Sequence, residues 1–98
     1  MKRLVKFSVH DYMDMYPSDA YYVFSGENED EILGKAKEFE THMKENYSGG
    51  TTNFIKILSK EEAEKLYNDN IKSLRDSGSD EDVMKADEME QEFHDIYD

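Results

Sequence analysis

The sequence predicts a small α+β protein with the element order ββαβαα, built as a three-stranded mixed sheet with helices packed on it. Two observations support this class. Branched and aromatic residues gather in three short runs, at 4–10, 20–25 and 51–58, as in strands. Elsewhere apolar residues recur every three or four positions, as in amphipathic helices. The length of 98 residues predicts a single domain, 1–98.

The first two runs are expected to pair as antiparallel strands. In LVKFSVH, Val5, Phe7 and Val9 alternate with polar residues, which predicts a strand with one buried face. In AYYVFS, at 20–25, both faces are apolar, which predicts a more central strand. The only proline of the chain, Pro17, marks the turn between them.

The third run, TTNFIKIL at 51–58, predicts the last strand of the sheet. The connection from the second strand to the third, through a helix, is expected to be a right-handed crossover. The first two helices would then cover one face of the sheet. The opposite face is expected to carry Lys6, Ser8 and some of Tyr21, Tyr22 and Phe24.

Three helices are predicted from their caps and their periodicity. Asn28 begins the first, with Glu31 at the capping-box position, and Gly49-Gly50 ends it. Gly34 lies inside this helix, and we expect a strand to pack closely against it. The second helix begins at Ser59 with a capping box to Glu62, and the third begins at Ser79 with Asp82.

The sequence contains no motif that predicts catalysis, a metal site or a cofactor. The histidines His10, His42 and His94 lie on different predicted elements, and none is four residues from another. A calcium loop beginning at Asp76 fails, because Glu81 stands where the loop needs glycine. There is no Walker loop, G-x-S-x-G or G-x-G-x-x-G. The protein is therefore expected not to be an enzyme and to need no cofactor.

The charge is strongly negative and unevenly distributed. The net charge is −12, of which residues 79–98 contribute −8. Such a field repels nucleic acid and anionic membranes and attracts basic surfaces, so direct nucleic-acid binding is not expected. No apolar run of 18 residues is present, and cysteine is absent, which is typical of a cytoplasmic protein.

The predicted helix at 79–98 has an almost purely anionic outer face. On a helical wheel its apolar residues fall on one side. The carboxylates that fall on the other side are Asp80, Glu81, Asp87, Glu88, Glu92, Asp95 and Asp98. One interpretation is that this helix only keeps a small protein soluble. The other is that it imitates the phosphates of a nucleic-acid backbone, since both present regularly spaced negative charges.

In size, charge, lack of cysteine and the acidic stretch Ser79–Asp98, the chain resembles the small acidic proteins that phages make early in infection to disable host machinery. Among these are DNA mimics directed at HU-type nucleoid proteins, glycosylases, restriction enzymes and Cas nucleases. The resemblance implies a class of function and assigns no role to any residue. It also implies host cytoplasm as the location, with association to the nucleoid through the partner.

The function expected from the sequence is therefore inhibition of a basic DNA-binding host protein, with an HU-type protein as the favoured partner. The carboxylates of the helix at 79–98 are the expected contacts, and Glu29 and Asp30, with Glu27 and Glu31, form a second cluster. Two alternatives remain. One is an adaptor or modulator of transcription machinery that uses the aromatic sheet face, and the other is a small hydrolase.

Overall fold

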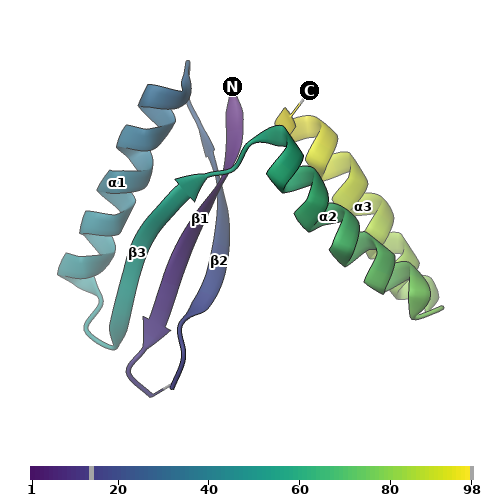
Figure 1. Cartoon of the computed structure of the whole chain (residues 1–98), viewed down its shortest axis with the longest axis horizontal. Helices are drawn as coiled ribbons and strands as arrows, with labels where there is room; N and C mark the ends of the chain where they lie inside the picture. The colour runs from purple at the N-terminus through teal and green to yellow at the C-terminus, as the bar shows by residue number, and fades with distance from the viewer. Residues whose placement is uncertain (14, 98) are drawn as a thin grey trace. The chain divides into compact units, whose positions relative to one another are not determined.

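The computed structural model describes residues 1–13 and 15–97 and contains three strands and three helices in the predicted order (Figure 1). The elements are β1 Lys2–Asp11, β2 Ser18–Ser25, α1 Glu29–Asn46, β3 Gly50–Ile57, α2 Lys60–Asp76 and α3 Asp80–Tyr97. The α+β class is thus confirmed. The chain forms two compact units, a sheet unit of residues 1–58 and a helical unit of residues 59–98. The single domain stays a prediction.

The strand order is β2-β1-β3, and β1 pairs antiparallel with both neighbours. The predictions of a mixed sheet and of a central second strand are therefore wrong. The strand β1 inserts between the two strands that α1 connects, so these two run parallel without touching. The apolar character of β2 on both faces does not reflect burial, because Tyr22 is 43% exposed and Val23 is 42% exposed.

The core of the sheet unit lies between α1 and one face of the sheet. Its fully buried residues are Val5, Phe7, Ile32 and Ala36, and Phe24, Phe39, Phe54 and Ile57 pack against them. The ring of Phe7 lies 5.1 Å from that of Phe39 on α1 and 6.1 Å from that of Phe54 on β3, between ring centroids. The buried residues that alternate along β1 therefore face α1, as predicted.

Two aromatic residues of β2 do not lie where the sequence placed them. The ring of Tyr22 lies 5.6 Å from that of Phe7 and 5.2 Å from that of Phe39, and Phe24 also contacts both rings. Tyr22 and Phe24 thus belong to the face that α1 covers. Tyr21 pairs with Lys6 and shares the opposite face with it, because directly opposed residues point to the same side of a sheet.

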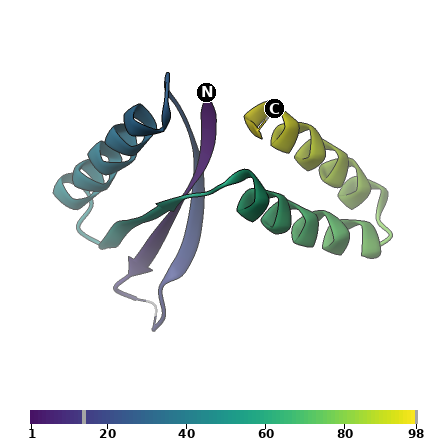
Figure 2. The same cartoon turned by 45° about the horizontal axis from the view of Figure 1, so that its top comes forward.

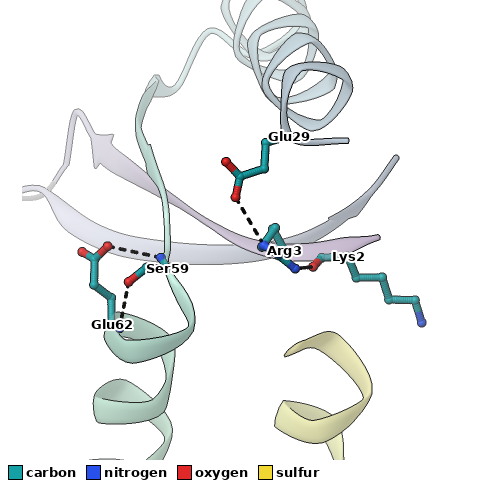
Figure 3. A network of polar contacts seen from close by, with 5 residues as sticks. All are labelled: Lys2, Arg3, Glu29, Ser59 and Glu62. Carbon is teal, nitrogen blue, oxygen red and sulfur yellow. Dashed lines mark hydrogen bonds and ion pairs between the residues drawn. The ribbon is translucent and has the colours of Figure 1, made fainter. Parts of the chain in front are cut away.

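In the helical unit, α2 and α3 lie side by side (Figures 1 and 2). The predicted capping box begins α2. The Glu62 N–H donates to the Ser59 hydroxyl, and the Ser59 N–H donates to the Glu62 carboxylate, each at 3.2 Å (Figure 3). The buried residues of α2 are Ala63, Tyr67 and Ile71, and those of α3 are Ala86, Ile96 and Tyr97. Packing on the sheet is thus shown for α1, whereas α2 and α3 pack on each other. None of the helices in the described part of the chain is long and apolar enough to cross a membrane.

Two glycines have opposite surroundings, which gives a test of the fold. A Cβ on Gly34 would meet no atom within 4 Å, so the expected close packing of a strand there is wrong. A Cβ on Gly50 would lie 2.3 Å from the His10 carbonyl oxygen, because β3 passes tightly along β1 at that point.

We therefore expect Gly34→Ala to raise the free energy of unfolding by about 0.5–1 kcal/mol, through higher helix propensity. Gly50→Ala should lower it by about 1–3 kcal/mol, because the added methyl forces the two strands apart. Urea denaturation followed by circular dichroism measures both. Equal effects of the two substitutions would contradict the pairing of β1 with β3.

Candidate functional site

The negative charge of the protein is concentrated in the helical unit. Residues 59–98 hold fourteen acidic and five basic residues, a net charge of −9, whereas residues 1–58 hold ten acidic and seven basic residues, a net charge of −3. A binding partner that responds to charge is therefore attracted mainly to the helical unit.

Aromatic packing fixes the inner face of α3. The half-buried ring of Phe93 lies 5.7 Å from the ring of Tyr67 on α2 and stacks at 5.5 Å on that of Tyr97. Ala86 and Ile96 are buried on the same side. These contacts leave the carboxylates of α3 on its outer side, as the helical wheel predicted. The helix begins where expected, since the Val83 N–H donates to the Ser79 carbonyl at 3.0 Å.

Three of the α3 carboxylates are held by residues of α2 or of the turn that follows it. The guanidinium of Arg75 lies 3.2 Å from Asp87 and 3.1 Å from Glu90, so it bridges one turn of α3. The Ser77 hydroxyl donates to Asp82 at 2.6 Å, instead of Asp82 capping its own helix. These contacts fix the positions of the carboxylates while leaving Asp87 and Glu90 exposed.

Glu92 also interacts with α2. Its carboxylate accepts a hydrogen bond from the Tyr67 hydroxyl, which is buried between the helices. Burial, the negative charge of Glu92, its hydrogen bond and the proximity of Tyr97 together raise the pKa of Tyr67 to about 12, and burial is the largest of these causes. Asp95 accepts a hydrogen bond from the Gln91 amide at 3.1 Å. Glu92 and Asp95 therefore combine a structural contact with an exposed position.

The remaining predicted contact residues of α3 are unengaged. Asp80, Glu81 and Glu88 are exposed, and within residues 1–13 and 15–97 their side chains form no hydrogen bond or ion pair. Their charge is directed entirely to solvent. Asp98, which the sequence included, lies outside the described residues.

The second predicted cluster belongs to the sheet unit, in the first turn of α1. The Glu29 carboxylate lies 3.5 Å from the Arg3 guanidinium (Figure 3). Glu31 lies 3.5 Å from the Lys35 ammonium and accepts the Glu27 N–H. Asp30 is exposed and has no partner in the described part of the chain. Basic residues thus offset much of this cluster, which makes it a weaker attractor than α3.

Sequence analysis missed a hollow of about 220 Å³ between α2 and α3. Its lining includes the aromatic rings of Tyr67 and Phe93 and the carboxylates of Glu64 and Glu90. The signal in the sequence that could have indicated this hollow was the helical period of α2, in which Glu64 directly follows the buried Ala63. A cationic side chain suits such a hollow, because carboxylates and aromatic faces both attract it.

The described residues offer no arrangement of three His, Cys, Asp or Glu side chains that could hold a metal ion. His10 lies on β1, His42 on α1 beside Asn46, and His94 on α3 beside the ring of Phe93. The structure therefore brings no two of the histidines onto one element.

Comparison with protein-family models, with curated proteins and with solved structures gives no match.

The contact between Tyr67 and Glu92 predicts a late tyrosine titration. Since the folded pKa of about 12 lies above the ordinary value of 10.0, the protonated hydroxyl stabilises the fold below pH 10, and this contribution is lost as the pH rises through 12. Ultraviolet absorbance should show a tyrosine ionisation step near pH 12.

Tyr67→Phe should remove this late step, and Tyr12→Phe, at a position 65% exposed, should leave it unchanged. Glu92→Gln should lower the pKa of Tyr67 but keep it above 10, because burial is the largest cause of the rise. A late step that persists in Tyr67→Phe would contradict the assignment.

Proposed function

We propose that this protein is a non-enzymatic acidic inhibitor that binds the basic DNA-binding surface of a host protein and displaces DNA from it. The observation that carries the proposal is the outer face of α3, where seven of the described carboxylates are exposed on a helix held in place by α2. These are Asp80, Glu81, Asp87, Glu88, Glu90, Glu92 and Asp95.

The spacing of the carboxylates supports imitation of a nucleic-acid strand. The pairs Asp80/Asp87 and Glu81/Glu88 are seven residues apart, which is about 10.5 Å along a helix axis. Three phosphate steps along one strand of duplex DNA advance about 10.2 Å. Lysine and arginine side chains that contact phosphates at this interval would meet carboxylates at a similar interval on α3.

The contacts of Arg75 support the proposal because they preorganise the surface. Asp87 and Glu90 are fixed by the guanidinium before any partner binds. A prepositioned side chain loses less conformational entropy on binding, which is commonly about 0.5–1.5 kcal/mol for each flexible side chain that must be ordered. Arg75 also reduces the repulsion that such a dense set of carboxylates would otherwise produce.

The hollow between α2 and α3 gives the surface a feature that a uniform charged helix lacks. An arginine of the partner would lie against the rings of Tyr67 and Phe93 while contacting Glu64 and Glu90. DNA-binding proteins use arginine for many of their contacts. The proposed partner is an HU-type nucleoid protein, whose DNA site is a basic cleft. The inhibitor is then a phage product acting in the host cytoplasm, at the nucleoid through its partner.

The adaptor alternative loses part of its basis. Of the three aromatic residues proposed for an open sheet face, Tyr22 and Phe24 contact the rings of Phe7 and Phe39 on the face that α1 covers. Only Tyr21 lies on the face opposite α1. No specific observation favours a hydrolase.

Removal of unengaged charge should weaken binding to a purified HU-type protein. The double variant Glu81→Gln, Glu88→Gln keeps shape and removes two exposed carboxylates that contact nothing else among the described residues. We expect the affinity at low salt to fall about two- to tenfold, mainly through a slower association rate. Surface plasmon resonance at several salt concentrations measures both.

The matched control is Glu38→Gln, Glu45→Gln on α1. These two glutamates are also exposed, also seven residues apart and also without a partner in the described part of the chain, so the change in net charge is identical. The control should bind almost as tightly as the unmodified protein. Equal losses in the two variants would show that overall charge acts, and would remove α3 as the specific contact.

Competition with DNA gives the direct test. Added protein should release the HU-type partner from duplexes of unrelated sequence, because contacts to phosphates carry little sequence information. The protein alone should not shift DNA in the same gel assay. A stable complex of protein, partner and DNA would contradict the proposal, and so would direct binding of this chain to DNA.

A further inference from the structure

The two edge strands of the sheet differ in protection. At the edge formed by β3, the Phe54 N–H donates to the Glu40 carboxylate of α1 at 2.5 Å, and α1 packs mainly against this strand (Figure 1). A charged side chain thus occupies a backbone group that would otherwise be available for pairing. Edge strands commonly carry such protection against unwanted association.

The register of β2 shows which of its backbone groups face outward. The Gly26 N–H donates to the Met1 carbonyl at 2.9 Å, and hydrogen-bonded pairs alternate along an antiparallel ladder. The backbone groups of Ala20, Tyr22 and Phe24 therefore point to β1. Those of the alternate residues, which are Asp19, Tyr21, Val23 and Ser25, point away from it.

One contact confirms this direction, and the remaining outward groups are open. The Ser25 carbonyl accepts a hydrogen bond from the Lys35 ammonium at 2.5 Å, outside the ladder. Within residues 1–13 and 15–97, the outward N–H and carbonyl groups of Asp19, Tyr21 and Val23 have no hydrogen-bond partner. The edge of β2 therefore presents a row of donors and acceptors ready to pair with another strand.

The side chains of β2 do not oppose such pairing. The strand SDAYYVFS contains no lysine and no proline, and its single charge, Asp19, lies 3.6 Å from the Lys6 ammonium. Four large apolar side chains close to the start of β2 are also exposed: Tyr12 is 65%, Met13 91%, Met15 85% and Tyr16 75% exposed. Large apolar side chains gathered at one end of the sheet are typical of an interaction surface.

We propose that β2 pairs antiparallel with β2 of a second copy of this chain, across a two-fold axis at Tyr22, to form a continuous six-stranded sheet. The outward residues are symmetric about Tyr22, so Tyr21 and Val23 exchange hydrogen bonds with Val23 and Tyr21 of the partner subunit. The same register places Asp19 opposite Ser25 of the partner subunit, so the two Asp19 carboxylates are not opposed to each other. It also extends Tyr16 toward residue 28 of the second copy, which covers some of the exposed side chains close to the start of β2.

The distribution of charge makes the edge of β2 a more favourable contact for a second copy than the helical unit. Two chains of net charge −12 repel each other, yet β2 lies in the unit that carries only −3 and itself has one charge. Association through β2 keeps the contact in the less charged unit of each copy. Because long-range repulsion opposes dimerisation, added salt should strengthen the dimer.

Amide hydrogen exchange on the unmodified protein gives the first test, together with sedimentation velocity over a range of concentrations. In the dimer, the amides of Tyr21 and Val23 become protected as concentration rises, at least tenfold relative to the dilute protein. Those of Tyr22 and Phe24 are protected at every concentration, because they belong to the ladder with β1.

A single cysteine at the axis gives the second test, since the chain contains none. In an antiparallel ladder, two directly opposed residues that do not exchange hydrogen bonds have Cα atoms about 4.5 Å apart. This distance is within the range of a disulfide. Tyr22→Cys should therefore form a disulfide-linked dimer on mild oxidation. Ile55→Cys, at a similarly exposed position on the other edge strand (47% against 43%), should not.

The outcomes separate the alternatives. A monomer at all concentrations up to the solubility limit overturns the proposal. So does a dimer in which Tyr21 and Val23 exchange freely, because another surface then forms it. Protection of these two amides in a monomer overturns it as well, since the edge is then covered from within the chain. Concentration-dependent protection together with the Tyr22→Cys crosslink supports it.

Discussion

The sheet unit depends on the burial of one side chain, Phe7, at the centre of its middle strand. The ring contacts aromatic rings from β2, β3 and α1, so a single residue connects all four elements of the unit. A chain with only 37% hydrophobic residues has few alternatives for building a core. Aromatic rings suit this task, because each buries about 150–250 Å² and gains from edge-to-face contact.

The helical unit solves a different problem, which is to hold a helix of high negative charge in place. Packing of Phe93 between Tyr67 and Tyr97 supplies apolar contact, and Arg75 supplies positive charge to two carboxylates one turn apart on α3. The hydrogen bond from Tyr67 to Glu92 adds a polar contact at the same junction. Tyr67 and Arg75 both lie on α2, so they stabilise α3 from its inner side and its outer side keeps its charge.

Sequence patterns predicted the elements well, because caps and periodicity are local. Ser59 with Glu62, Asn28 with Glu31 and the alternation along β1 all appear in the structure as expected. Strand order was not predictable in this way, since alternation shows which face is buried and not which strand is central. The wheel of α3 likewise identified its outer carboxylates, but only the packing of α2 shows that Arg75 holds Asp87 while Glu81 and Glu88 stay unengaged.

The two proposed surfaces obey different physics, which allows them to be judged independently. Contact through α3 is led by charge and attracts a basic partner, so salt should weaken it. Contact through β2 uses backbone hydrogen bonds and apolar side chains between two copies of like charge, so salt should strengthen it. The opposite signs arise because fourteen of the acidic residues lie in the helical unit, whereas the exposed edge lies in the sheet unit. An effect of salt in the same direction on both contacts would mean that at least one surface has been assigned to the wrong interaction.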